Sequence, residues 1–212
     1  MIAREEILGR VRTALGPDPA IPEIPRDYVV ATTLDRDGLV ERFAERAAEY
    51  RATVWRCSTD DVHQAVAAAA AEHGARRLVA PDGLPAEWRS EGIEWLLDGE
   101  RHLGVHELDG ADGVVTGCAL AIADTGTIVL DAGERQGRRA LTLLPDLHVC
   151  VVESGQVVGT VPEAIRRLGD AVRTGRRPVT FISGPSATSD IELNRVEGVH
   201  GPRRLEIVVA SR

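Results

Sequence analysis

Apolar residues recur along the chain at two spacings, and these spacings predict alternating helices and strands. Residues 36–51 place apolar side chains three or four positions apart, which is typical of one buried face of a helix, and the run 52–57 (A-T-V-W-R-C) is typical of a strand. An alanine-rich helix then ends at Gly74, a residue suited to the left-handed conformation of helix ends, and a short strand follows at 77–80. Such alternation predicts a largely parallel sheet with helices on its faces.

The second half of the chain changes to a pattern of closely spaced strands. Two short apolar runs, 119–123 and 127–130, flank the turn sequence Asp-Thr-Gly and predict a β-hairpin. Later runs predict a buried strand at 147–152, a helix at about 161–173 and a second buried strand at 179–183. A final strand is predicted at 205–210. We expect one mixed sheet of about six or seven strands, mainly parallel, with a single hairpin.

Residues 1–27 differ from the rest of the chain. Residues 3–15 carry apolar side chains at helical spacing, and the prolines at positions 17, 19, 22 and 25 then prevent a helix from continuing. We therefore predict a helical arm with a proline-rich linker over 1–27, and one α/β domain over 28–212. The arm either docks on its own domain or contacts a second copy of the chain or another partner, and a homo-oligomer is one outcome of the second alternative.

Composition excludes several classes of partner. A formal net charge of −8 opposes binding to a phosphate backbone, and two Phe, three Trp and two Tyr are too few for a base-stacking platform, so we expect no nucleic acid partner. The charged N-terminus lacks the apolar core of a signal peptide, and no apolar stretch approaches the ~18 residues of a membrane span. We expect a cytoplasmic protein that does not bind a membrane.

The chain also lacks residue patterns that hold cofactors. Its cysteines, Cys57, Cys118 and Cys150, are too few for an iron–sulfur cluster, which normally needs four thiolates, and their number and spacing indicate reduced thiols. All 25 basic residues are arginines, so a Schiff-base lysine and a P-loop lysine are excluded. There is no G-x-G-x-x-G turn for a dinucleotide, and the histidines show no metal-ligand spacing. We expect no metal and no cofactor on this chain.

Three polar segments with glycine lie where predicted strands end, the place at which open α/β sheets tend to bind ligands. The first is 183–192 (S-G-P-S-A-T-S-D-I-E), whose exposed backbone N–H groups favour an anion such as a phosphate or a carboxylate. Its hydroxyl groups are equally suited to ordinary helix capping, with Asp190 and Glu192 balancing a helix dipole.

The second segment comprises 116–118 (T-G-C) and 124–127 (D-T-G-T). Asp-Thr-Gly is also the sequence of the catalytic loop of aspartic proteases, but that chemistry needs two such loops to form its carboxylate pair, and only one is present. A plain hairpin turn is the alternative to a binding function for this segment.

The third segment is 199–202 (V-H-G-P), just before the last predicted strand. Its His200 can act as a general base or a hydrogen-bond donor near neutral pH, or it can simply stabilise the turn. Upstream, Arg135, Arg138 and Arg139 offer guanidinium forks that suit a carboxylate, and a solvated basic loop is the alternative.

Together these segments resemble the lactate-utilization (LUD) family. Three runs look like family signatures in the same order and spacing: 116–130 (T-G-C-A-L-A-I-A-D-T-G-T-I-V-L), 144–152 (L-P-D-L-H-V-C-V-V), and 182–192 (I-S-G-P-S-A-T-S-D-I-E) with 198–202 (G-V-H-G-P). The likeness covers roughly residues 30–210. It implies a Rossmann-like three-layer α/β/α domain, similar to the fold of sugar-phosphate isomerases, CoA transferases and formyltetrahydrofolate cyclo-ligase.

The resemblance also implies a function in oxidising L-lactate to pyruvate beside iron–sulfur partner proteins. Because this chain has no evident means of storing the electrons of that reaction, we expect a non-redox subunit that binds a small carboxylate substrate, with the iron–sulfur clusters on the partners. The alternatives are an independent enzyme for a small phosphorylated or acyl substrate, by analogy with the fold, and a regulatory or scaffold protein.

The three segments, the arginine loop and the resemblance give one set of expected site residues. For binding an anion or substrate we expect Thr116, Gly117, Thr125, Gly126, Thr127, Arg139, Ser183, Gly184, Ser186, Thr188 and Glu192. For catalysis the candidates are Asp124, Asp190 and His200.

Overall fold

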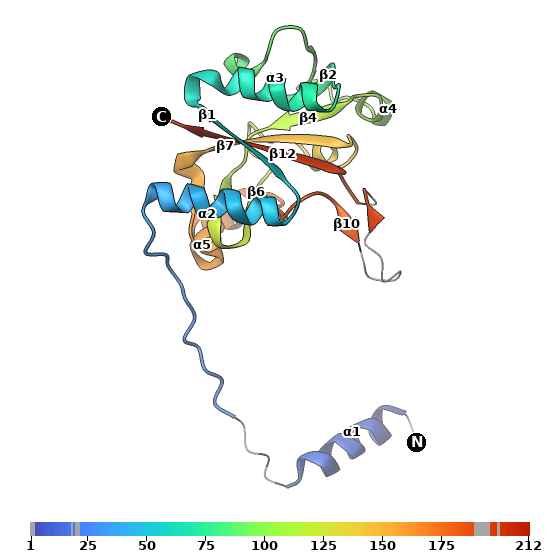
Figure 1. Cartoon of the computed structure of the whole chain (residues 1–212). Coiled ribbons are helices and arrows are strands. Elements are labelled where there is room, and N and C mark those ends of the chain that lie inside the picture. The colour runs from blue at the N-terminus through green and yellow to red at the C-terminus, as the bar shows by residue number, and fades with distance from the viewer. Residues whose placement is uncertain (1–2, 18, 20–21, 189–195, 199) are drawn as a thin grey trace.

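The computed structural model describes residues 3–17, 19, 22–188, 196–198 and 200–212. Its domain is built on a six-stranded sheet in the order β1-β12-β7-β4-β2-β3, in which every neighbouring pair is parallel (Figure 1). The strands of this central sheet are β1 (Thr53–Ser58), β2 (Arg77–Pro81), β3 (Glu94–Asp98), β4 (Gly113–Thr116), β7 (Leu147–Glu153) and β12 (Arg204–Ser211).

Helix α3 (Val62–Glu72) covers one face of the central sheet (Figure 1). Its alanine-rich surface packs against apolar side chains of several strands, among them Leu78 of β2 and Val151 of β7, which are fully buried. The helix is capped by His73, and the next residue, Gly74, has φ of 65°, the left-handed conformation that the sequence predicted.

The opposite face is covered by helix α2 (Arg36–Glu49) and by a second, four-stranded sheet in the order β8-β5-β6-β9. Phe43 of α2, Ile128 of β6 and Ile207 of β12 are fully buried members of one core cluster, so the helix and both sheets share this core. The strands of the second sheet are β5 (Leu120–Ile122), β6 (Thr127–Leu130), β8 (Val157–Val158) and β9 (Thr180–Ile182).

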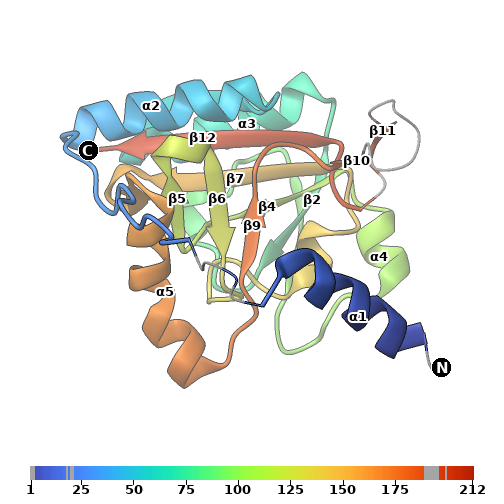
Figure 2. The ribbon, with the colours of Figure 1, turned by 90° about the horizontal axis from the view of Figure 1, so that it is seen from below.

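Helix α5 (Val161–Gly175) packs on the outer side of the second sheet through Ala164 and Leu168 (Figure 2). The helix begins with a reciprocal cap. The hydroxyl of Thr160 accepts a hydrogen bond from the backbone N–H of Glu163, and the Glu163 carboxylate accepts one from the backbone N–H of Thr160. The cap fixes the start of α5 directly after strand β8 of the second sheet.

Short elements complete the connections between the longer ones. Two short strands, β10 (Ala187–Thr188) and β11 (Val196–Glu197), form an antiparallel pair. The remaining elements are helix α4 (Val105–Asp109) and the 3-10 turns η1 (Thr59–Asp61), η2 (Ala86–Trp88), η3 (Ala123–Thr125), η4 (Arg139–Thr142) and η5 (Ser154–Gln156).

The prediction of an α/β protein with a mainly parallel central sheet flanked by helices is confirmed, but three details differ. The β5–β6 hairpin belongs to the second sheet, and segment 179–183 forms the edge strand β9, with Phe181 45% exposed, where we predicted a buried strand. The sequence analysis also missed β3, β4 and α4. Each of these has only four or five residues, which is too short to display a periodicity.

One buried carboxylate ties helix α3 to the central sheet. Glu206 of β12 is 2% exposed, and its Oε2 accepts a hydrogen bond of 2.6 Å from the indole Nε1 of Trp55 on β1. Its Oε1 lies 2.8 Å from Nε2 of His73, the residue that ends α3. Both carboxylate oxygens therefore have a partner, which offsets the cost of burying the charge.

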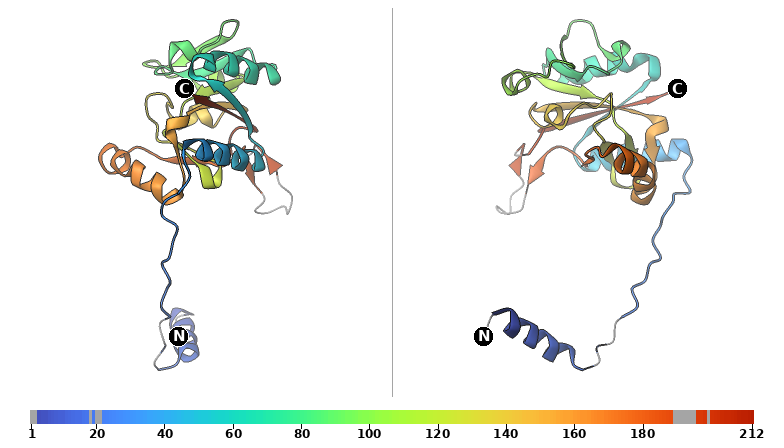
Figure 3. Two further views of the ribbon diagram at one scale, coloured as in Figure 1. Left: turned by 60° about the vertical axis from the view of Figure 1, so that its left-hand side comes forward. Right: turned by 180° about the vertical axis from the view of Figure 1, so that it is seen from behind.

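Helix α1 (Ala3–Leu15) stands away from the domain and buries none of its residues (Figure 3). Ile7 and Leu15 on its apolar face are 60% and 58% exposed. The linker reaches the domain at Val30, whose carbonyl oxygen accepts a hydrogen bond from the guanidinium of Arg166 on α5. The predicted helix is therefore present, and its apolar face is open to solvent. None of the described helices is long and apolar enough to cross a membrane.

We expect the removal of residues 1–27 to leave the domain as stable as it is in the full chain, because α1 contributes no buried surface to it. In differential scanning calorimetry, the unfolding midpoints of the two chains should agree within about 2 °C. A fall of about 5 °C or more at low protein concentration would show that the arm docks on its own domain.

Candidate functional site

A cavity of about 240 Å³ lies between the two sheets, at the amino-terminal edge of the central one. His148 and Leu205, the second residues of β7 and β12, contribute to its lining from the central sheet. Strand β9 and the loop that follows it contribute from the second sheet, and η4 supplies Arg139 and Thr142. The volume suits a small organic ligand, below the size of a typical cofactor or drug.

Arg139 is the cationic group in the lining of this cavity. Its Nη1 donates hydrogen bonds of 2.8 Å to both the carbonyl oxygen and the hydroxyl of Thr142, which hold the guanidinium in place. Burial lowers the pKa of Arg139 from its ordinary value. Among the described residues no carboxylate pairs with it, so an anionic ligand can take that position.

The two neighbouring arginines have other partners. Arg138 forms a bidentate pair with Asp98, at 3.0 Å from Nε and 2.9 Å from Nη2, and it also donates to the carbonyl oxygen of Leu103. Burial raises the pKa of Asp98, but the hydrogen bonds from Arg138 and from the Leu103 N–H outweigh it and lower that pKa. Arg135 pairs with Glu153 at the other edge of the sheet. Only Arg139 of the three lines the cavity.

His148 is a neutral imidazole within the lining. It is 1% exposed, and its Nε2 lies 2.8 Å from the hydroxyl of Thr116 on β4. Burial, with a smaller effect from the positive charge of Arg139, lowers the pKa of His148 to about 3. The ring is therefore uncharged at neutral pH, and it adds no second positive charge beside Arg139.

A chain of hydroxyl groups supports the loop after β9. The hydroxyl of Ser183 lies 2.7 Å from that of Thr127 on β6, which lies 2.7 Å from that of Thr125. The next residue, Gly184, has φ of 85°, and a Cβ there would lie 2.4 Å from the carbonyl oxygen of Tyr50. Only glycine fits this position, because both the backbone conformation and the close approach exclude a side chain.

Ser186 joins the loop to the segment before β12. Its backbone N–H donates to the carbonyl oxygen of Pro202 at 2.8 Å, and its hydroxyl accepts a hydrogen bond of 3.1 Å from the backbone N–H of His200. The side chain of His200 is exposed at the cavity rim. Ser186 therefore fixes two segments that the sequence separates by 14 residues.

The structure brings part of the expected site together. Arg139, Ser183, Gly184, Ser186 and His200 line the cavity. The hydroxyls of Thr116, Thr125 and Thr127 lie behind that lining, within the hydrogen-bond chains just described. Asp190 and Glu192 lie outside the described residues, and Thr188 is described only as part of β10.

Three expected residues lie elsewhere. Asp124 pairs with Arg42 of α2 at 3.1 Å, in an exposed position. Gly126 has φ of 58°, and a Cβ there would lie 2.4 Å from the backbone nitrogen of Ala47. The Asp-Thr-Gly hairpin therefore packs tightly on α2. Gly117 does not line the cavity, and its backbone N–H donates to the carbonyl oxygen of Arg135.

The cavity also differs in place and in composition from what we expected. Its central-sheet residues stand at the amino ends of β7 and β12, whereas we expected ligands at the carboxyl ends of strands. The sequence analysis did not assign His148 to the lining, because a histidine within an apolar strand is typical of the core. The alternation of side chains along a strand could have indicated it. That alternation places His148 on the same face of β7 as Cys150 and Val152, which is the face toward the second sheet.

The arrangement suits a small carboxylate better than a metal. It combines one guanidinium, serine hydroxyls, a neutral imidazole and apolar carbon surface from Phe181 and Leu205. Within the part of the chain that the structure describes, no group of three or more His, Cys, Asp or Glu residues could hold a metal ion.

These features define an α/β domain with a small cavity whose lining combines one guanidinium with hydroxyl groups. Residues 40–210 match the LUD domain, so the chain belongs to the LUD domain family, as its motifs indicated. Lactate utilization protein C of Deinococcus radiodurans is 46% identical over 209 residues, which cover 99% of this chain and 96% of that protein. Lactate utilization protein C of Halalkalibacterium halodurans is 30% identical, covering 98% of this chain and 94% of that protein.

A solved structure has a similar fold. The crystal structure of a DUF162 family protein from Deinococcus radiodurans matches with a TM-score of 0.73 and 44% sequence identity, and it covers 84% of this chain and 99% of that one. The α/β architecture is therefore shared with a protein whose structure has been determined.

The neutral His148 predicts a pH dependence of stability. Its pKa is about 3 when folded and ordinarily 6.5, so below pH 6.5 the unfolded chain binds a proton that the folded protein does not. This contribution to stability is fully present above pH 6.5 and is lost as the pH falls, by about 2 kcal/mol between pH 7 and pH 5. Urea unfolding of the wild type and of His148→Gln at both pH values measures it. Equal losses in the two proteins would contradict the assignment.

Proposed function

We propose that this chain is a non-redox subunit of a system that oxidises L-lactate to pyruvate, and that it acts with iron–sulfur partner proteins. Its membership of the LUD domain family and its relatives named lactate utilization protein C support a role in lactate utilization. The match covers 96% and 94% of the length of these two relatives, so the resemblance is not confined to one part of them.

The observation that carries the proposal is Arg139 in its small cavity. A lactate or pyruvate carboxylate fits the guanidinium with two parallel hydrogen bonds, and the serine hydroxyls of Ser183 and Ser186 offer further donors. The neutral ring of His148 faces the same space and can hydrogen-bond the hydroxyl or keto oxygen of the ligand. Phe181 and Leu205 supply apolar surface for the methyl group.

The division of labour follows from the chemistry of the reaction. Lactate oxidation releases electrons, and the three cysteines of this chain are fewer than the four thiolates that an iron–sulfur cluster normally requires. Redox cofactors therefore belong on partner proteins, and this chain binds and presents the carboxylate. Its cysteines are all free, which supports a reducing, cytoplasmic compartment.

We expect Arg139→Gln to weaken the binding of L-lactate and pyruvate by about 10- to 100-fold, because it removes a charge-assisted hydrogen bond. Ser186→Ala should weaken it by about 3- to 10-fold. Isothermal titration calorimetry measures both effects. The matched control is Arg77→Gln, because Arg77 is exposed and its guanidinium pairs with Glu94 on the neighbouring edge strand β3, away from the cavity.

Two results would reject this site. One is binding of the carboxylates that is unchanged in Arg139→Gln and Ser186→Ala. The other is growth on lactate that both variants support as well as the wild type does in a strain that lacks the native chain.

The partner proteins can be tested separately from the pocket. An anaerobic affinity purification of the tagged chain from its own cells grown on lactate should recover iron-containing partners and transfer electrons from lactate to a dye. The Arg139→Gln variant should recover the same partners with reduced electron transfer, because the substitution changes one residue of the cavity lining. Recovery of the chain alone and free of iron would contradict the proposed assembly.

A further inference from the structure

A second, larger cleft lies at the opposite edge of the central sheet from the Arg139 cavity. Its volume is about 700 Å³, against about 240 Å³ for the first. It is lined by residues that follow the carboxyl ends of three strands: Thr59, Asp60 and His63 after β1, Trp88 and Arg89 after β2, and Glu153 at the end of β7. Arg135 completes it, and the carbonyl oxygen of Arg135 accepts a hydrogen bond from Gly117 directly after β4.

The topology of the sheet opens a crevice at this place. Strands β1 and β7 flank β12, and the chain leaves them toward opposite faces. After β1 it enters α3 on one face, and after β7 it enters β8 and α5 on the other (Figure 1). Strand β12 lies between these two strands in the sheet. Open α/β sheets bind ligands at carboxyl ends where connections diverge in this way.

Arg89 has a buried donor without an acceptor. Its Nε is fully shielded from solvent, and among the described residues no group accepts a hydrogen bond from it. A buried donor without an acceptor lowers the free energy of unfolding, because it has lost its hydrogen bonds to water and gained none in the protein. Arg89 also contributes to the lining of the cleft, so a turn of its side chain toward a bound oxyanion would give the shielded Nε its acceptor.

Arg135, the other arginine in the lining, is held in a fixed orientation. Its guanidinium carbon lies 5.4 Å from the ring centre of the buried Trp88, and its Nη1 lies 3.0 Å from Oε1 of Glu153. The ring covers one side of the guanidinium and the carboxylate engages one edge. The remaining N–H groups and the second face stay available to a ligand.

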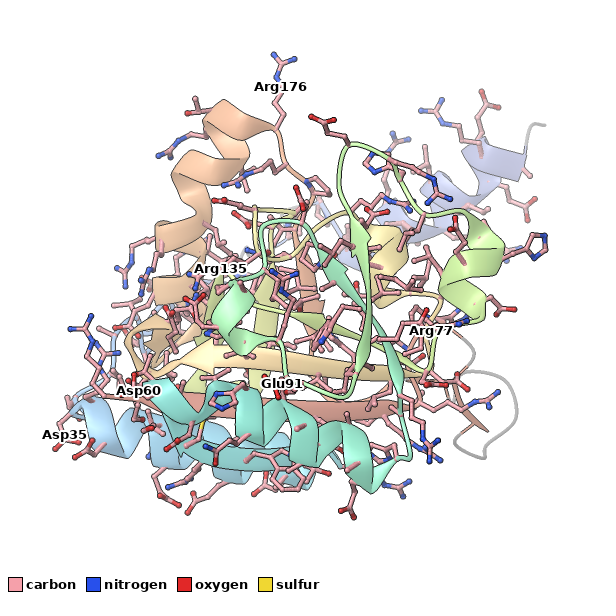
Figure 4. All side chains as sticks on the ribbon, turned by 90° about the horizontal axis from the view of Figure 1, so that it is seen from above. Asp35, Asp60, Arg77, Glu91, Arg135 and Arg176 are labelled. Atoms are coloured by element: carbon pink, nitrogen blue, oxygen red, sulfur yellow. The ribbon has the colours of Figure 1, made fainter. Side chains whose placement is uncertain are left out.

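Charge is graded from the inside of the cleft to its rim. His63, Arg89, Arg135 and Glu153 are partly buried, whereas the carboxylates of Asp60, Glu87 and Glu91 are exposed. Figure 4, seen from the α3 side, labels Asp60, Glu91 and Arg135, which come from three separate segments of the chain. Glu153 offsets the charge of Arg135, so the positive charge of Arg89 remains to favour a negative group in the interior, and the rim offers acceptors for hydroxyl or amino groups.

We propose that this cleft is a second ligand site, which binds an oxyanion-bearing molecule larger than lactate. The phosphate or carboxylate group of the ligand occupies the interior beside Arg89 and Arg135, and hydroxyl or amino groups at its other end face the rim carboxylates. The site is independent of the proposed lactate function, since it shares no lining residue with the Arg139 cavity.

The test uses pyrophosphate and citrate as probes of the two oxyanion sources, in calorimetric titrations of the full chain. At least one of them should bind the wild type, and Arg89→Met should weaken that binding by about tenfold or more. The free Arg89→Met protein should unfold at the same temperature as the wild type or higher, because the substitution removes an unpartnered buried donor. That second readout separates a lost ligand contact from a damaged fold.

Two control variants identify the site that the probe occupies. Arg77→Gln and Arg139→Gln should bind the probe as the wild type does, since neither residue lines this cleft. The inference is overturned if neither probe binds the wild type, if Arg89→Met binds as tightly as the wild type, or if Arg139→Gln abolishes the binding. Binding of pyrophosphate without citrate would identify a phosphorylated ligand, and the reverse would identify a polycarboxylate.

Discussion

Both faces of the parallel central sheet have to be covered, and this requirement organises the rest of the molecule. Strands β7 and β12 are buried almost throughout, so neither can present a face to water. Helix α3 covers one face, but α2 alone does not cover the other, and the β5–β6 hairpin with its second sheet fills the remaining area. The second sheet in turn exposes its own outer face, which α5 covers. Each layer therefore covers the apolar surface that the layer before it leaves exposed.

The smaller cavity is a consequence of that second sheet. Strand β9 pairs with β6 at its free edge, and the chain must then return to β12 in the central sheet. The loop that makes this passage carries Ser183, Gly184 and Ser186 over the amino end of β7, where it encloses His148 with Arg139. The proposed lactate function thus depends on the junction of two sheets. A single sheet with the same local sequence would leave these side chains apart.

The two arginine-lined spaces lie at opposite edges of the central sheet and differ in how their charge is held. Arg139 is fixed by neutral oxygen atoms of Thr142, so its positive charge is available to a small carboxylate. Arg135 is already half neutralised by Glu153, and Arg89 keeps a buried donor without an acceptor. A small anion suits the first space, and a larger ligand with both oxyanion and hydroxyl or amino groups suits the second.

The sequence by itself determined most of the secondary structure and the family, because these depend on local spacing and on contiguous motifs. It predicted α2, β1, α3, the β5–β6 hairpin, β7 and α5 nearly at their observed bounds. It did not determine that the hairpin leaves the central sheet, because membership depends on pairs such as Ile128 with Ile182, which are far apart in the chain. Nor could spacing separate Arg139 from Arg138, whose charge Asp98 neutralises across the fold. Long-range contacts decided which of the expected residues meet in one cavity.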